Sequence, residues 1–174
     1  WQGTMDGARA AERQGHNVLL LGQAGTGKTT AIKSFHSMLT HMGKTVALTA
    51  STGIAAVNLG GKTLHSFSGI GDGRHPAHTI VNSILTNDDL AQIRDGILSA
   101  DCVIIDEVSM VSETVLQRVE TVLRKVRNCH LPFGGIQVSF KSTQYRLNYK
   151  FNFIIPLLCQ LHKSKSFSTE KKSC

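Results

Sequence analysis

Long apolar runs are missing from this chain of 174 residues. No stretch reaches the roughly eighteen consecutive apolar residues that a membrane-spanning helix needs. Cysteine is sparse: the four cysteines form no C-x-x-C pair, which argues against a disulfide framework or a cysteine metal site. No secretory signal is visible, and Trp1 stands where a Met would begin a complete chain. We therefore expect an intracellular protein that does not associate with a membrane, and a fragment or processed product.

Glycine is missing from residues 139–174, although the whole chain contains 16. The net charge of +7 is unevenly distributed. Residues 1–138 hold 12 basic and 11 acidic residues, whereas residues 139–174 hold seven basic residues and the single acid Glu170. This change predicts a folded domain over residues 1–138 and a divergent, irregular basic tail over residues 139–174. Because the tail carries most of the charge, net charge is weak evidence that the domain binds nucleic acid.

The most informative feature present is a glycine-rich phosphate-binding motif. The segment 22–29 reads G-Q-A-G-T-G-K-T, after the apolar run Val18–Leu21 and before a helical pattern, as in a P-loop. Glycines let successive N–H groups turn toward an anion, and the helix N-terminus adds positive charge. A chance glycine-rich turn is the less favoured alternative. The predicted nucleotide-binding residues are Gly22, Gln23, Ala24, Gly25, Thr26, Gly27, Lys28, Thr29 and Thr30.

Two carboxylates follow a second apolar run. Residues 102–105 read C-V-I-I and lead into Asp106 and Glu107, which is typical of a buried parallel strand whose carboxyl end faces a ligand. With ATP in the P-loop, Thr29 and Asp106 would hold Mg²⁺, Lys28 would contact the β- and γ-phosphates, and Glu107 would act as general base. The alternative is a solvated acidic pair that caps the next helix.

Helical and strand patterns alternate along residues 1–138. The longest helical pattern covers residues 112–127, where Val115, Leu116, Val119, Val122, Leu123 and Val126 form one apolar stripe. Residues 68–78 are predicted to form a loop, and a further strand is expected to begin at Ile136. This alternation predicts an α/β fold: a parallel sheet with helices on both faces.

Further motifs lie between and after the two nucleotide motifs: T-A-S-T-G-I-A-A from Thr49, G-K-T-L-H-S-F-S-G-I-G from Gly61, and P-F-G-G-I-Q-V from Pro132. With these motifs, residues 15–138 resemble the Pif-one family of superfamily-one DNA helicases. The resemblance implies a RecA-like first motor lobe of an ATP-dependent 5′-to-3′ helicase. It also implies ATP and Mg²⁺ as cofactors, roles in DNA repair, recombination and telomere maintenance, and a nuclear or mitochondrial location.

The resemblance implies single-stranded DNA as a partner, bound without reading the base sequence. Backbone and hydroxyl groups near Ser51 would bind phosphates, and His65 and Phe67 would support the strand or stack a base. The alternative places Phe67 in the core and gives His65 a local hydrogen bond. The DNA-contact residues implied are Ser51, Thr52, Gly53, Thr63, His65 and Phe67.

The sequence departs from the family at two places. Met5 stands where the family's adenine-reading Gln is expected, and the segment from Ser139 shows no match to the γ-phosphate sensor that follows P-F-G-G-I-Q-V. No second motor lobe is recognisable, so we expect this chain alone not to unwind DNA. Two alternatives stay open: a non-catalytic remnant that binds nucleotide or single-stranded DNA, and another P-loop enzyme such as a small-molecule kinase. The sequence gives no indication of oligomeric state.

Overall fold

The computed structural model describes residues 2–22, 25 and 27–142. Its centre is a five-stranded sheet in the order β1-β5-β4-β2-β3, in which every pair of neighbouring strands is parallel. The strands are β1 (Val18–Leu21), β2 (Val46–Ala50), β3 (Lys62–Thr63), β4 (Cys102–Asp106) and β5 (Gln137–Ser142). Parallel neighbours require a crossover between them, which explains why helices separate the strands in sequence.

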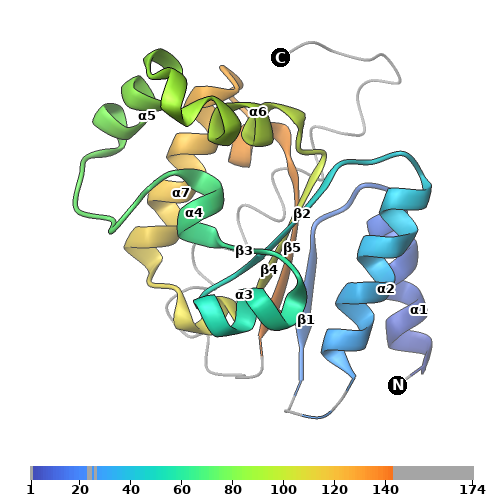
Figure 1. Ribbon diagram of the computed structural model, residues 1–174. Helices are drawn as coiled ribbons and strands as arrows, with labels where there is room; N and C mark the ends of the chain where they lie inside the picture. Colours follow the sequence, from blue (N-terminus) through green and yellow to red (C-terminus); the bar gives the residue numbers. More distant parts are fainter. Residues whose placement is uncertain (1, 23–24, 26, 143–174) are drawn as a thin grey trace.

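Helices cover both faces of the sheet (Figure 1). On one face lie α1 (Gln2–Arg13) and α2 (Lys28–His41), and on the other lie α4 (Leu64–Ser68), α5 (Ala77–Thr86), α6 (Ala91–Ser99) and α7 (Glu113–Val126). The short α3 (Gly53–Leu59) follows β2 at the lower end of the sheet in Figure 1. Three 3₁₀ turns complete the described part: η1 (Asp88–Leu90), η2 (Val108–Met110) and η3 (Pro132–Gly135). The predicted α/β fold is confirmed.

The alternation of side chains along β4 separates two apolar cores. Cys102 and Ile104 pack with α2, whereas Val103 and Ile105 pack with the α4–α7 layer, as expected when successive residues point to opposite faces. Every residue of β4 is buried. The strand therefore delivers its last residue, Asp106, from the centre of the molecule to the carboxyl edge of the sheet.

The predicted helix over residues 112–127 is confirmed as α7. Its apolar stripe faces the core, with Leu116, Val119 and Val122 fully buried. The Ser112 hydroxyl accepts a hydrogen bond from the Val115 N–H at 3.2 Å, which satisfies one of the free donors of the first turn. The predicted loop over residues 68–78 is shorter than expected, because α4 includes Ser68 and α5 already begins at Ala77.

The strand β5 continues through Ser142, and therefore runs into the segment that the sequence assigned to the tail. Residues 143–174 lie outside the described part of the chain, so the division into a domain and a tail stays a prediction. Among the described residues, no helix has the length and apolar character needed to cross a membrane.

Candidate functional site

The predicted phosphate-binding and acidic segments meet at the carboxyl edge of the sheet. β1 leads into the glycine-rich loop, β4 ends in Asp106, and β2 leads into Ser51. The Ser51 N–H donates a hydrogen bond to the Asp106 carbonyl at 3.2 Å, which joins two of these segments directly. Ligands of parallel α/β sheets bind at this edge.

Two glycines of the phosphate-binding motif adopt backbone conformations that favour glycine. Gly25 and Gly27 both have a φ of 79°, a left-handed conformation that residues with a Cβ rarely adopt. Gly27 precedes α2 and provides no side-chain cap for its N–H groups. The first N–H groups of α2 have no partner within the helix itself, so they and the positive end of the helix dipole favour an anion at this position.

Only some of the other residues predicted to bind nucleotide lie in the described part of the structure. Gly22 is buried, and Thr29 and Thr30 are exposed in the first turn of α2. Gln23, Ala24, Thr26 and the side chain of Lys28 lie outside the described part of the structure. Their roles stay predictions.

The two carboxylates have different environments. Asp106 is buried, with 6 % of its surface exposed, whereas Glu107 is half-buried and has a φ of 53°. A left-handed backbone in a non-glycine residue costs of order 1 kcal/mol or more and often occurs at functional sites. The bend at Glu107 turns the chain from β4 into η2.

A lysine that the sequence reasoning did not identify lies between these groups. The Lys141 Nζ is 2.8 Å from Asp106 Oδ1 and 3.8 Å from Glu107 Oε1. It also donates a hydrogen bond to the Thr29 hydroxyl at 3.1 Å. Lys141 belongs to β5, which lies between β1 and β4. A single ammonium group therefore contacts both residues predicted to hold Mg²⁺.

The Mg²⁺ expected from the sequence does not fit this arrangement. Its oxygen donors, Thr29 and Asp106, are suitable in type, but Mg²⁺ binds oxygen at about 2.0–2.1 Å and keeps an octahedral shell. The Lys141 ammonium forms an ion pair with Asp106 Oδ1 at 2.8 Å and donates a hydrogen bond to the Thr29 hydroxyl at 3.1 Å. A metal ion in contact with the same two atoms would meet a buried like charge.

The residues implied in DNA contact lie along one edge of the site. Ala50 of β2 pairs with Thr63 of β3, and this pairing brings the segment 51–53 next to the segment 63–67. The Thr52 hydroxyl caps α3 by accepting from the Ala55 N–H at 3.3 Å, and the Thr63 hydroxyl caps α4 by accepting from the Ser66 N–H at 3.1 Å. Both helix N-termini therefore begin beside the strand ends.

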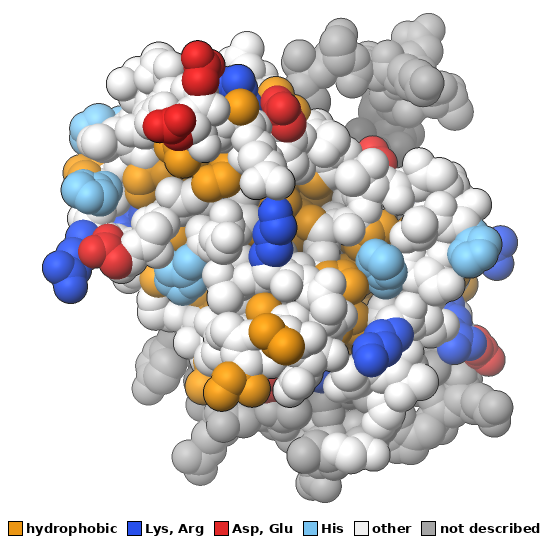
Figure 2. Space-filling model, in the orientation of Figure 1, with side chains coloured by type: hydrophobic (Ala, Val, Ile, Leu, Met, Phe, Trp, Pro, Cys, Tyr) orange, Lys and Arg blue, Asp and Glu red, His pale blue; other side chains and the backbone are white. Residues whose placement is uncertain are grey.

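The surface next to these caps is partly apolar. Ile54 and Val57 of α3 are 80 % and 79 % exposed, and hydrophobic side chains are visible over this region in Figure 2. Phe67 is buried within the core of the α4–α7 face and His65 is half-buried. Phe67 therefore lies in the core, which was the alternative to DNA contact in the sequence analysis. Its contact with DNA stays a prediction.

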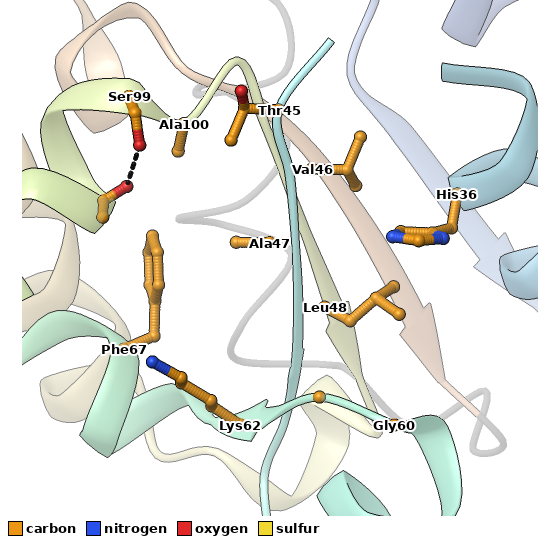
Figure 3. Close-up of a pocket in the computed structure, with 12 residues that line it drawn as sticks. His36, Thr45, Val46, Ala47, Leu48, Gly60, Lys62, Phe67, Ser99 and Ala100 are labelled. Carbon is orange, nitrogen blue, oxygen red and sulfur yellow. Dashed lines mark hydrogen bonds between the residues drawn. The ribbon is translucent and has the colours of Figure 1, made fainter. Parts of the chain in front are cut away.

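A separate pocket of about 400 Å³ lies at the other half of β2. Phe67, Ala47 and Thr45 line one side of the strand, and His36 lies on the opposite side with Val46 and Leu48 (Figure 3). β3 pairs with Thr49 and Ala50 of β2, so within the described part of the chain no strand pairs with the first half of β2 on this side. Among the described residues, those that line this pocket belong neither to the glycine-rich loop nor to the acidic pair.

Comparison with known proteins assigns the family. Residues 5–149 match the family model described as PIF1-like helicase. The chain belongs to the PIF1-like helicase family. It is 43% identical over 128 residues to the human ATP-dependent DNA helicase PIF1, covering 72% of this chain and 19% of that protein. It is 36% identical over 135 residues to PIF1 of Saccharomyces cerevisiae, covering 76% of this chain and 15% of that protein.

Solved PIF1 structures confirm the RecA-like fold. The crystal structure of Pif1 helicase from Candida albicans has a TM-score of 0.73 at 34% identity, covering 79% of this chain and 31% of that one. Bacteroides Pif1 in complex with ADP-AlF3 and single-stranded DNA has a TM-score of 0.67 at 31% identity, covering 87% of this chain and 36% of that one. The chain therefore spans about a third of these solved chains and less than a fifth of the curated relatives above.

Proposed function

We propose that this chain is the nucleotide-binding first motor lobe of an ATP-dependent 5′-to-3′ DNA helicase. The main support for the proposal is the placement of the α2 N-terminus, which follows the glycine-rich loop, beside the buried acid of β4. Thr29 and Asp106 both lie within 3.1 Å of the same Lys141 nitrogen. A phosphate group held by the glycine-rich loop would therefore lie next to Asp106 and Glu107.

The related structures support adenine nucleotide and single-stranded DNA as ligands. One Bacteroides Pif1 structure contains ADP-AlF3 and single-stranded DNA. In this chain the segments 51–53 and 63–67 present helix N-termini and hydroxyl groups at the same edge of the sheet. Such groups bind phosphates and carry no base-sequence information, so we propose sequence-independent contact. Repair, recombination and telomere maintenance would belong to a complete helicase.

Binding of a fluorescent ATP analogue to the 174-residue chain tests the proposal. Lys28→Ala should abolish binding, because this lysine would contact the phosphates. Lys33→Ala is the matched control: it removes the same charge from an exposed position on the same helix and should leave binding unchanged. Affinity of the Lys28→Ala variant within about twofold of the wild type would refute nucleotide binding by this loop.

One observation favours a second candidate, binding without turnover. The Lys141 ammonium contacts the groups expected to hold the metal, and hydrolysis by this class of site depends on that metal. The chain would then be a nucleotide- and DNA-binding remnant of a helicase. Membership of the PIF1-like family removes the support for a small-molecule kinase.

A further inference from the structure

The side chain of Lys141 points into the nucleotide site because of the alternation of β5. Val138 and Phe140 pack in the core of the α4–α7 face. Their neighbours Ser139 and Lys141 must then point to the α1 and α2 face. Ser139 contacts Glu12 of α1 there, and Lys141 contacts Thr29 of α2. The alternation of β5 therefore directs the Lys141 side chain to the α1 and α2 face of the sheet.

The ammonium group of Lys141 is buried and paired with two carboxylates. Lys141 is 5 % exposed, and a charge so removed from water is tolerated only when it is paired. The Asp106 carboxylate at 2.8 Å and the Glu107 carboxylate at 3.8 Å provide that pairing. The Thr29 hydroxyl accepts from the same nitrogen. The family resemblance implies that Thr29 and Asp106 hold the metal ion and that Glu107 activates the water that attacks the nucleotide.

We propose that the Lys141 ammonium is the resident cation of this site and takes the place of Mg²⁺. This inference rests on the proposed nucleotide-binding function and specifies its cofactor requirement. The ammonium provides one positive charge beside the bound phosphates, where a divalent ion would provide two. The chain binds adenine nucleotide equally well with and without Mg²⁺, and Asp106 is held as an ion-pair partner of Lys141 and not as a metal ligand.

Titration of the whole chain with N-methylanthraniloyl-ADP, in EDTA and then in MgCl₂, tests the inference. Wild-type affinity should be the same in both buffers. Lys141→Met removes the ammonium and keeps an unbranched side chain, so Mg²⁺ should strengthen binding to this variant by about tenfold or more. Lys125→Met, which removes an exposed lysine of α7, should behave as the wild type.

Electron paramagnetic resonance with Mn²⁺ in place of Mg²⁺ gives a second readout that is independent of turnover. In the presence of ADP, Lys141→Met should immobilise Mn²⁺ and the wild type should leave it free. Stronger wild-type binding in MgCl₂, together with immobilised Mn²⁺ in the wild type, would overturn the inference while nucleotide binding stands. Loss of analogue binding in both buffers would instead overturn the proposed function. The wild-type comparison remains decisive if the variant does not fold.

Discussion

The Glu12 carboxylate accepts a hydrogen bond from the Ser139 hydroxyl, and this contact joins the last turn of α1 to the centre of β5. Both residues are buried. Gln137, two residues earlier on the same face of β5, donates to the carbonyls of Glu12 and His16 at 3.0 Å and 2.8 Å. The polar face of β5 thus holds the N-terminal helix with Gln137 and Ser139, and reaches the nucleotide site with Lys141.

Glu12 gives the stability of the chain a distinct pH dependence. Burial raises the pKa of Glu12 from 4.5 to about 7, although the Ser139 hydrogen bond and the charge of Lys44 both oppose this rise. A carboxyl group with a raised pKa binds its proton more tightly in the folded state. Protonated Glu12 therefore adds to the free energy of unfolding below pH 4.5, and this contribution is lost as the pH rises through about 7.

Glu12→Gln should remove this dependence and keep an oxygen that can accept from Ser139. Relative to the variant, the wild type should lose about 3 kcal/mol of unfolding free energy between about pH 4.5 and 7.5. Urea unfolding of both proteins across this range measures the difference. Parallel stability curves for the two proteins would show that Glu12 does not titrate in this window.

The close approach of Gly61 to β2 predicts a strong steric effect. A Cβ at Gly61 would lie 2.2 Å from the Leu48 carbonyl oxygen, so β2 and β3 would have to separate. Gly61→Ala should destabilise the chain by about 3 kcal/mol, at the upper end of typical overpacking costs.

Gly96→Ala provides the contrast for this prediction. Gly96 lies inside α6 and a Cβ there would meet no atom within 4 Å. Alanine should therefore stabilise the helix by about 1 kcal/mol. Thermal unfolding of the two variants should move in opposite directions, and a similar shift for both would contradict the contact between Gly61 and Leu48.

Arg127 connects the end of α7 with two other segments. Its Nη1 donates to the carbonyls of Ile97, Leu98 and Ala100 at 2.8–3.2 Å, and its Nε donates to the Gly134 carbonyl at 2.8 Å. Arg127→Met keeps much of the apolar contact and leaves these carbonyls unpaired. We expect a loss of about 3 kcal/mol, because hydrogen bonds to charged groups contribute roughly 1.5–3 kcal/mol each and do not add fully.

Two variants separate the hydrogen bonds of Arg127 from its charge. Arg127→Lys keeps the charge but lacks the planar fork, so it should recover only part of the stability. Lys125→Met removes a charge from the exposed side of the same helix and should change stability by less than about 0.5 kcal/mol. Equal stability of Arg127→Met and the wild type in urea unfolding would refute the proposed role.

The parts of the fold that sequence predicts well have local signals. The apolar stripe of α7 and the buried run of β4 show their periodicity within a few turns or residues, and the structure confirms both. α5 was not predicted, because Thr79, Asn82 and Thr86 are weak helix formers. Its buried Ile80 and Ile84 are a helical signal only one turn long.

The polar residues of β5 show what sequence alone could not predict. Gln137, Ser139 and Lys141 are buried, but their hydrogen-bond partners in α1 and α2 lie more than 100 residues away in sequence, and the ion-pair partners of Lys141 lie on another strand and the turn after it. The polar residues of β5 themselves give no sequence signal that distinguishes a buried strand from an exposed segment. The one available signal was the spacing of Val138 and Phe140, since apolar residues two apart favour a strand that continues beyond Val138.

The charge of the C-terminal segment predicts how the chain responds to salt in DNA binding. Residues 143–174 carry six basic residues and one acid, and β5 ends at Ser142. Removing residues 143–174 therefore deletes no residue of the five described strands. The basic residues concerned are Arg146, Lys150, Lys163, Lys165, Lys171 and Lys172.

Each phosphate neutralised on a single strand contributes about 0.7 to the slope of log affinity against log salt. Deletion of residues 143–174 should therefore reduce the slope for a single-stranded oligonucleotide by up to about 4, and a weaker, less salt-sensitive component should remain. A full-length variant with the six basic residues replaced by Gln should give the same reduced slope, which would show that charge causes the effect. Loss of all binding in both variants would mean that residues 50–67 make no contact with DNA, since the helix N-termini at Thr52 and Thr63 are retained in each.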